Sequence, residues 1–396
     1  MESLFAERIT GVPRSFIREI LKVSLDPSVI SFAGGLPNPK FFPVDQIREA
    51  TQRVFSNYGA SVLQYSNSEG DIALRELIAK RYETHKGLNI SPENIIITNG
   101  SQQGLDLLGK VLLNDNDRLV IEKPGYLGAI QSLSLFRPEF VPVQMENDGM
   151  DVHALERECS AGRPKLMYSV PIFQNPSGVS YSESKKEKIA AIVDKYGFVL
   201  VEDDPYGELR FSGEATKSFH HFLPEMTVLL GSFSKVVAPG LRLGWIVAKG
   251  ALYEKLLVAK QASDLHTSSF SQKIVCEYLL HNDLDAHIAK ITEVYGEQCR
   301  TMQNALGKYF SKDVEFTNPE GGMFLWGSLP AEMNSMALFD EAVKEKVVFV
   351  PGDPFYTSEK NCPSLRLNFS CVDSDTIEEG VLRMAKAFSR YSCLKN

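Results

Sequence analysis

The chain has 396 residues, of which 43% are hydrophobic and 23% are charged, as in ordinary globular proteins. Its net charge of −8 argues against a general binder of nucleic acids or membrane surfaces. No apolar run reaches the roughly 18 residues of a transmembrane helix, and the first residues lack the apolar core of a signal peptide.

The N-terminal segment lacks a hydrophobic core of its own. Ile30–Pro39 holds two glycines and two prolines and is followed by Phe42 and Pro43, so by itself it is predicted to be a turn. We therefore expect residues 1–42 to pack against a later part of the chain.

The middle of the chain alternates between short apolar strands and helical patterns. Strands are predicted at residues 94–98, 118–121, 166–170, 198–201 and 228–230, and helices at 101–113, 127–136 and 184–196. The third helix is expected to begin at a capping box, Ser184-x-x-Glu187, and to end at Gly197. Such alternation predicts an α/β fold with a mostly parallel, doubly wound sheet that binds ligands at the carboxyl ends of its strands.

The pattern changes after about Asp283. The elements expected there are a long helix to about residue 310, strands at 314–316, 321–326 and 365–369, and helices at 338–346 and from 374. This order predicts a smaller α+β unit. We therefore expect a large domain at residues 43–283 and a small domain formed by residues 1–42 and 284–396.

The cysteines and histidines indicate a protein that resides in a reducing compartment and has no metal site. The six cysteines are scattered and form no Cys-x-x-Cys pair, which favours free thiols in a cytoplasmic protein. No His-x-x-x-His zinc pair occurs, and His220 and His221 near Pro224 are expected to lie in a surface loop.

The most informative segment is Leu229–Gly244. An apolar strand ends at Ser232 and Ser234, Lys235 follows, and a Pro-Gly turn precedes Arg242. Two hydroxyls and an arginine suit a phosphate dianion, and the lysine beside them could form a Schiff base with an aldehyde. Pyridoxal 5′-phosphate carries both groups.

The full spacing, Ser-x-Ser-Lys-x-x-x-Pro-Gly-x-Arg-x-Gly, resembles the cofactor-lysine segment of the class I/II aminotransferases, which are fold-type I pyridoxal-phosphate enzymes. Four further segments are similar to the kynurenine/2-aminoadipate aminotransferase group: Ile17-Arg18, Ile30–Pro39, Leu63–Ser66 and Gly100–Gly104. The resemblance runs from about Arg14 to the last helix. It implies a cytoplasmic homodimer with shared active sites.

An acid is expected to pair with the ring nitrogen of the cofactor. Asp203 and Asp204 both follow the strand that begins at Phe198, and either could instead cap a helix or lie in a solvated turn. The Asp-x-x-Tyr spacing to Tyr206 matches the family from Asp203. We therefore assign the ring-nitrogen role to Asp203, with Asp204 as the alternative.

The resemblance assigns further residues to the cofactor. Asn175 and Tyr206 are implied to donate hydrogen bonds to the ring hydroxyl, although Asn175 lies in what could be a plain turn. Gly100, Ser101 and Gln102 open a helix and are implied to bind the phosphate, with Ser101 also a candidate helix cap.

Two tyrosines complete the implied cofactor site. Tyr126 matches the residue that stacks on the pyridoxal ring; without the resemblance it would be interpreted as a core aromatic residue. Tyr65 is implied to reach the cofactor phosphate of the partner subunit, the alternative being a core tyrosine.

Substrate binding is expected from three regions. An arginine inside an apolar strand needs an anion, so Arg366 is assigned to the α-carboxylate, with a structural ion pair as the alternative. The resemblance places Gly35 and Asn175 beside the substrate. It also implies that Arg18 binds a side-chain carboxylate, although Arg18 could equally lie on a solvated helix face.

These features predict an aminotransferase that moves the amino group of an L-amino acid to a 2-oxo acid by a ping-pong mechanism. The expected donors are 2-aminoadipate, aromatic and large aliphatic amino acids, and 2-oxoglutarate is an expected acceptor. One alternative is a pyridoxal-phosphate lyase or synthase. Another is a non-catalytic, ligand-sensing domain of a transcription regulator, although the Gly34-Gly35 phrase comes too early to leave room for a preceding DNA-binding domain.

Overall fold

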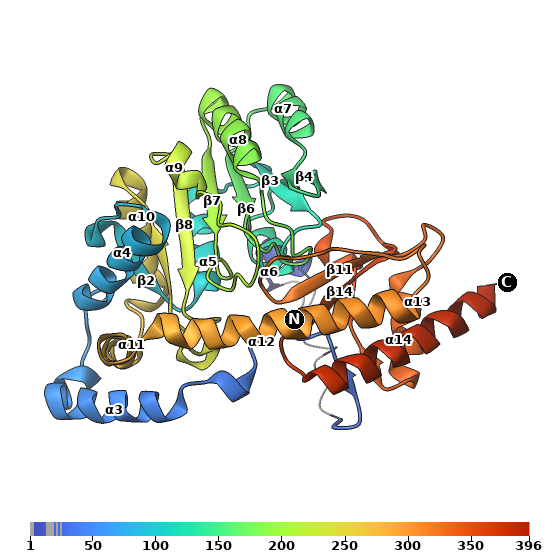
Figure 1. The fold of residues 1–396 in the computed structure, drawn as a ribbon. Coiled ribbons are helices and arrows are strands. Elements are labelled where there is room, and N and C mark those ends of the chain that lie inside the picture. The colour runs from blue at the N-terminus through green and yellow to red at the C-terminus, as the bar shows by residue number, and fades with distance from the viewer. Residues whose placement is uncertain (1–3, 13–19, 21–22, 24–25, 396) are drawn as a thin grey trace.

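The structure is a computed structural model that describes residues 4–12, 20, 23 and 26–395. Its centre is an eight-stranded sheet (Figure 1). Across this sheet the strands follow the order β2 (Ile95–Thr98), β9 (Gly244–Val247), β8 (Thr227–Ser232), β7 (Val199–Asp203), β6 (Leu166–Ser169), β3 (Arg118–Lys123), β4 (Glu139–Glu146) and β5 (Gly149–Met150). The contacts among β3, β4, β6, β7 and β8 are all parallel, whereas β9 runs antiparallel to both of its neighbours.

Both faces of this sheet are buried, because successive strand residues point to opposite sides and both sets are apolar. On one face, Val120 and Leu200 belong to the hydrophobic core that also includes residues of α7, α8 and α9. On the other face, Ile121 and Val201 belong to the larger core that includes residues of α5. The predicted α/β class with a doubly wound, mostly parallel sheet is confirmed.

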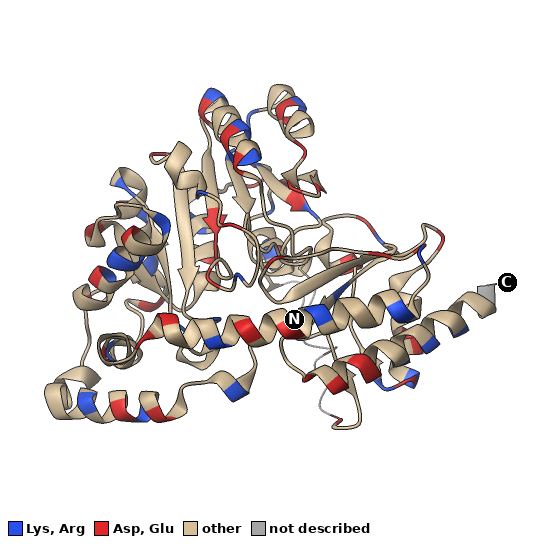
Figure 2. Cartoon of the chain, viewed as in Figure 1, with Lys and Arg blue, Asp and Glu red and all other residues tan. Residues whose placement is uncertain are grey.

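Helices surround the sheet and connect its strands (Figure 1). In the first three-quarters of the chain they are α1 (Glu7–Thr10), α3 (Val44–Tyr58), α4 (Ile72–Lys86), α5 (Ser101–Leu112), α6 (Leu127–Ser134), α7 (Val152–Ala161), α8 (Glu183–Tyr196), α9 (Phe219–Phe222), α10 (Gly250–Asp264) and α11 (Ser269–His281). Charged residues are spread along the outer helices, with acidic and basic residues interspersed (Figure 2).

A second, four-stranded antiparallel sheet follows in the C-terminal part. Its order is β10 (Glu315–Phe316), β11 (Phe324–Ser328), β14 (Ser364–Asn368) and β13 (Val350–Pro351). The helices of this part are α12 (Leu284–Tyr309), α13 (Ser335–Lys344) and α14 (Ser374–Lys395), and α14 packs against both others. In Figure 1, α12 extends from the side of the central sheet to that of the smaller one. Near the N-terminus, β1 (Ile30–Ser31) pairs in parallel with β12 (Val347–Val348).

Three local predictions were wrong. The side chain that caps α8 belongs to Ser182, whose Oγ accepts a hydrogen bond from the Lys185 amide, so the helix begins before the predicted box at Ser184. Helix α13 ends two residues earlier than predicted. His220 is not on a surface loop: it lies in α9 with 6% of its surface exposed, because this short helix packs against the sheet.

None of the helices in the described part of the chain is long and apolar enough to cross a bilayer. Within the same residues, no group of three His, Cys, Asp or Glu side chains is arranged to hold a metal ion.

Candidate active site

The predicted site residues gather at one edge of the central sheet. Strands β2, β3, β6, β7 and β8 end at this edge, and the antiparallel strand β9 begins there after the loop that leaves β8, so five loops meet. A cavity of about 300 Å³ opens between these loops. It is lined by Leu36, Gly100, Ser101, Gln102, Tyr126, Val170, Asn175, Asp203, Pro205, Tyr206, Ser232, Ser234, Lys235, Pro239 and Arg242.

The adjacent acids at the end of β7 lie in different surroundings. Asp203 lines the cavity and is 2% exposed; its Oδ2 accepts a 2.7 Å hydrogen bond from the Tyr168 hydroxyl. The other oxygen, Oδ1, is buried and has no hydrogen-bond partner among the described residues. Burial raises the pKa of Asp203 to about 7. Asp204 is paired instead with Lys86 and accepts a 2.7 Å hydrogen bond from the Gly207 amide.

Arg366 and Asn175 are joined although they are far apart in sequence. Arg366 lies on β14 with 1% of its surface exposed, and its guanidinium donates to Asn175 Oδ1 at 2.9 Å and to the Ala33 carbonyl at 2.6 Å. Asn175 Nδ2 in turn donates to the Tyr206 hydroxyl at 3.3 Å. The guanidinium also lies over the Phe324 ring at 4.3 Å.

No carboxylate among the described residues pairs with Arg366, and its Nε has no hydrogen-bond partner there. The alternative of a structural ion pair is therefore not supported by the contacts. Burial lowers the pKa of this guanidinium to about 10. A buried guanidinium without an acidic partner is unfavourable unless an anion reaches it, and a substrate carboxylate would meet that need.

The side chain of Lys235 reaches the N-terminal segment. Its Nζ donates a 2.7 Å hydrogen bond to the Gly35 carbonyl, and it lies 5.9 Å from the centre of the Tyr206 ring. Burial lowers the pKa of Lys235 to about 8, and the positive charges of Arg366 and Arg242 act in the same direction. A larger fraction of this amine is therefore neutral, and hence nucleophilic, near neutral pH than for an ordinary lysine.

An anion-binding arrangement lies at the start of α5. Gly100 occupies the N-cap position, and no side chain caps the first turn, so the expected cap at Ser101 is wrong. The first backbone N–H groups of a helix and its dipole favour an anion. Ser232 Oγ and Ser234 Oγ lie 2.9 Å apart nearby, and Arg242 forms no ion pair within the described part of the chain.

Two glycines allow this close approach. Gly100 has a positive φ of 74°, and a Cβ atom on it would lie 2.7 Å from Arg242 Nη2. A Cβ atom on Gly244 would lie 2.6 Å from the Ser101 amide nitrogen. Larger residues at either position would push apart the start of α5 and the segment that carries Arg242.

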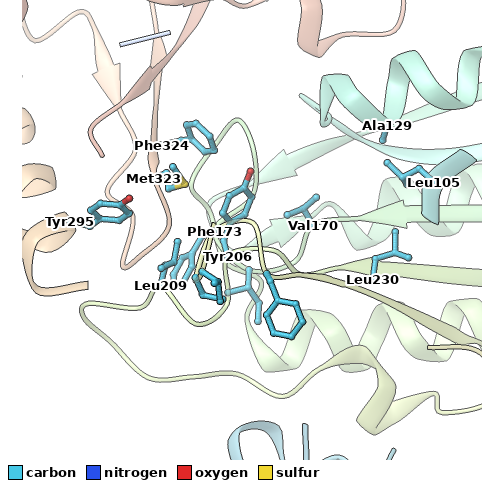
Figure 3. Close-up of a cluster of buried hydrophobic side chains, with 14 of the residues drawn as sticks. Leu105, Ala129, Val170, Phe173, Tyr206, Leu209, Leu230, Tyr295, Met323 and Phe324 are labelled. Carbon is cyan, nitrogen blue, oxygen red and sulfur yellow. The ribbon is translucent and has the colours of Figure 1, made fainter. Parts of the chain in front are cut away.

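One aromatic and one amide side chain, those of Tyr126 and Gln102, border the same cavity. Tyr126 precedes α6 and lines the cavity, and burial raises its pKa to about 12. Gln102 is exposed on the first turn of α5, and its Nε2 donates to the Gly128 carbonyl at 3.1 Å. Figure 3 shows Tyr206 among buried side chains from both sheets, with Leu230 from the central sheet and Phe324 from the smaller one.

Three predicted residues are absent from the lining of this cavity: Gly35, Arg366 and Tyr65. Gly35 and Arg366 adjoin it through their hydrogen bonds with the lining residues Lys235 and Asn175. Tyr65 does not line it: 79% of its surface is exposed, and its ring packs edge-on against His266 with 5.9 Å between the ring centres. The alternative of a core tyrosine is therefore wrong. Arg18 lies outside the described residues.

Sequence reasoning missed Tyr168, which contacts Asp203. The signal available was weak: Tyr168 lies in a predicted strand, and a buried tyrosine hydroxyl needs a partner. Pairing it with Asp203 requires knowledge that β6 and β7 are neighbours. Leu36, Val170, Pro205 and Pro239 also line the cavity without having been predicted to do so.

The cavity fits the functional groups of pyridoxal 5′-phosphate. Asp203 Oδ1 is a buried acceptor without a partner among the described residues, as a protonated ring nitrogen would require. The uncapped start of α5, the two serines and Arg242 suit a phosphate, and Lys235 supplies an amine for an aldehyde.

Comparisons with known proteins agree with this arrangement. The family model for aminotransferase class I and II matches residues 29–384. The aromatic-amino-acid aminotransferase 1 of Thermococcus litoralis is 40% identical over 391 residues, which cover 97% of this chain and 94% of that protein. The 2-aminoadipate transaminase of Thermus thermophilus is 39% identical over 387 residues, with coverages of 97% and 96%.

A solved structure is similar over nearly the whole chain. It is that of LysN, the α-aminoadipate aminotransferase of Thermus thermophilus, complexed with N-(5′-phosphopyridoxyl)-L-leucine. It superposes with a TM-score of 0.93 at 38% sequence identity and covers 99% of each chain.

Proposed function

The chain belongs to the class I and II aminotransferases, and from this membership we propose how its residues divide the work of transamination. The protein is a pyridoxal 5′-phosphate-dependent aminotransferase, and we propose a 2-oxo acid such as 2-oxoglutarate as the acceptor. When bound, the cofactor supplies an aldehyde that takes up the amino group and a ring that withdraws electrons. The observation that carries the division of roles is the buried Oδ1 of Asp203, unpartnered among the described residues, in the cavity that Lys235 also lines.

We assign Lys235 two tasks. With the cofactor bound, its Nζ would hold it covalently between turnovers. Once the substrate amine has freed it, the same nitrogen would take the proton from the substrate α-carbon and deliver it to the cofactor carbon that carried the aldehyde. The lowered pKa favours this, because a lysine that is half neutral at about pH 8 can accept and release a proton near physiological pH.

The remaining residues are proposed to orient the cofactor and the substrate and to stabilise their charged groups. Asp203 is proposed to keep a proton on the ring nitrogen, and Asn175 and Tyr206 to donate to the ring hydroxyl. Gly100, Ser101, Gln102, Ser232, Ser234 and Arg242 are proposed to bind the phosphate, and Tyr126 to stack on the ring. Arg366 is proposed to bind the substrate α-carboxylate next to Gly35 and Asn175, because its guanidinium is buried without an acidic partner among the described residues.

The proposed amino donors are 2-aminoadipate, aromatic and large aliphatic amino acids. The names of the similar proteins support this range, since one acts on aromatic amino acids, one on 2-aminoadipate, and one is complexed with a leucine derivative. Of the described residues that line the cavity, Lys235 and Arg242 are the only ones with a permanent or titratable positive charge. A second substrate carboxylate would therefore need another cation, and Arg18 is our candidate.

We propose a cytoplasmic homodimer with shared active sites. Its support is an apolar surface formed by Phe55, Leu63, Ile72 and Leu280 on α3, α4, α11 and the adjoining turn, each of them at least 48% exposed. These elements contact one another, and exposed large apolar side chains gathered on neighbouring elements are typical of protein interfaces. All six cysteines are free, in keeping with a reducing compartment.

We also propose the division into a large domain, residues 43–283, and a small domain, residues 1–42 and 284–396. The separate sheets support it, as does the pairing of β1 with β12, which joins the N-terminal segment to the C-terminal part.

Two measurements test the proposed function. Borohydride reduction of the holoenzyme followed by peptide mapping should place the phosphopyridoxyl label on Lys235, and a label on any other lysine would contradict the assignment. A panel of L-amino acids assayed with and without 2-oxoglutarate should show turnover that depends on the oxo acid. Steady product formation without any oxo acid would indicate a lyase or synthase instead.

A further inference from the structure

Only one oxygen of Asp203 is available to the cavity. The Tyr168 hydroxyl donates to Oδ2 at 2.7 Å, whereas Oδ1 is buried and unpartnered among the described residues. Tyr168 itself is fully buried, and nothing in the proposed division of roles uses it. The hydroxyl of Tyr168 is therefore a buried polar group whose hydrogen bond is accepted by the Asp203 carboxylate beside the cavity.

Strand register explains the contact. In the β6–β7 ladder, Tyr168 lies opposite Val201, and Asp203 comes two residues later on the same strand. Because alternate residues of a strand face the same side, Tyr168, Val201 and Asp203 project from one face of the sheet. The tyrosine ring reaches diagonally to the last residue of the neighbouring strand.

The charge state of Asp203 depends on this contact. Burial raises its pKa, and the nearby acids Asp204 and Glu122 act in the same direction, whereas the hydrogen bond from Tyr168 lowers it. An unpaired buried carboxylate would take up a proton and lose its attraction for a protonated ring nitrogen. Besides Tyr168, the titratable side chains that interact with Asp203 are Asp204, Glu122, Tyr126 and Tyr206.

We propose that Tyr168 is a positioning residue for the cofactor: its hydroxyl holds the Asp203 carboxylate with Oδ1 presented to the ring nitrogen and keeps that carboxylate charged. The proton of the pair then stays on the ring nitrogen, since the tyrosine already donates to the other oxygen of the acid. This inference rests on the proposed placement of Asp203 beside the ring.

The chain offers a matched control in Tyr181. This tyrosine is also fully buried, and its hydroxyl donates to a buried carboxylate, Glu122 Oε1, at 2.8 Å. Unlike Tyr168, it belongs to the core on the opposite face of the sheet. Tyr181→Phe therefore removes a hydrogen bond from an equally buried tyrosine to a carboxylate other than Asp203. Glu122 keeps its hydrogen bonds from Ser169, Val170 and Gln174, so its own charge is expected to stay unchanged. Phenylalanine keeps the ring packing in both variants, so both are expected to fold, and thermal unfolding checks this.

Two readouts other than turnover test the proposal. The first is the dissociation constant of pyridoxal 5′-phosphate, measured by reconstituting the apo-protein. Tyr168→Phe should weaken binding by about tenfold, as expected for a lost hydrogen bond to a charged group, and Tyr181→Phe should leave it within about twofold of the wild type.

The second readout is the infrared C=O stretch of protonated Asp203 in the apo-protein, isolated by subtracting the spectrum of Asp203→Asn. Its titration midpoint should lie near pH 7 in the wild type and about one pH unit higher in Tyr168→Phe, with no such change in Tyr181→Phe.

The possible failures are distinguishable. If Tyr168→Phe behaves like Tyr181→Phe in both readouts while Asp203→Asn loses cofactor affinity, Tyr168 is only part of the core and the proposal is overturned. If Asp203→Asn binds the cofactor as tightly as the wild type, the assignment of Asp203 to the ring nitrogen fails as well.

Discussion

Asp203 and Asp204 are adjacent in the chain, yet their carboxylates have different partners. Asp203 faces the cavity with one oxygen that no described residue contacts by a hydrogen bond, whereas Asp204 is paired with Lys86 and holds the turn at Gly207. At the scale of single residues, one acid is therefore available to a ligand and the other stabilises the loop that carries Tyr206.

Substitution should separate these two tasks. Asp203→Asn keeps the shape but removes the charge, so the rate of the first half-reaction should fall by about 10²-fold or more. Asp204→Asn should slow it by less than about tenfold, but it leaves Lys86 unpaired and should lower the free energy of unfolding by about 2 kcal/mol. Single-turnover rates and urea denaturation measure both quantities. Equal rate losses in the two variants would mean that the acids were assigned wrongly.

The lowered pKa of Lys235 makes the stability of the apo-protein depend on pH. Below about pH 8 the folded protein must bury a charged amine, which is unfavourable. Between about pH 8 and the ordinary lysine value of 10.5, the unfolded chain still binds a proton that the folded chain has released. The free energy of unfolding therefore gains a contribution as pH rises through this window.

We expect this contribution to be about 1–3 kcal/mol, and Lys235→Met should abolish it. The wild type and the variant are unfolded with urea as apo-proteins at about pH 7.5 and about pH 10. These two pH values enclose most of the window. The difference between the two proteins isolates Lys235 from other groups that titrate in the same range. Parallel pH dependences would show that the amine is not desolvated in the folded state.

At the scale of elements, α5 and α8 begin in contrasting ways. Ser182 caps α8 with its side chain, so the free N–H groups of that helix are partly satisfied within the protein. Gly100 precedes α5 without any side-chain cap, and this helix points its first turn at the cavity. The uncapped helix start is the one left for an anion.

The cap on α8 can be tested by substitution. Ser182→Ala should lower the free energy of unfolding by about 1 kcal/mol, because the Lys185 amide loses its acceptor. Ser184→Ala, at the position where the sequence predicted the cap, should change it by less than about 0.5 kcal/mol. Urea denaturation of the two variants decides the matter, and the reverse order would restore the predicted capping box.

At the scale of the whole molecule, Tyr65 does not line the cavity of its own chain. The side chain is 79% exposed, which is unusual for a tyrosine whose ring packs against His266. Leu63, two residues earlier, is 70% exposed. An exposed pair of this kind is expected where a second copy of the chain completes the surface.

Subunit mixing tests whether Tyr65 acts in the partner's site. In a hybrid of Lys235→Ala and Tyr65→Ala chains, one site would carry both defects and the other would be intact. Random mixing should then restore up to about a quarter of wild-type activity, since half of the dimers are hybrids and each has one working site. Both parents must be severely impaired for the test to be valid. Hybrids without activity would contradict a role of Tyr65 in the partner's site.

The sequence by itself determined the features that depend on neighbours along the chain. The alternation of apolar strands and helices predicted the α/β sheet, because a strand buried on both faces is a continuous apolar run and a helix that covers it is apolar at every third or fourth residue. The spacing from Ser232 to Arg242 predicted the cofactor, because its phosphate and aldehyde ligands come from one strand end and the turn after it. The cap at Ser184 failed because Ser182, two residues earlier, caps α8 instead. The exposure of His220 failed because α9 packs against β8 and α8, which a local pattern does not show.

Only the tertiary structure decided the relations between distant segments. It separated Asp203 from Asp204, joined Arg366 to Asn175, and brought Tyr168 to Asp203. Each of these contacts depends on strand order and register, which shift a side chain by several ångströms or to the opposite face when they change by one residue. A single sequence contains the residues that make such contacts but not the distances between them.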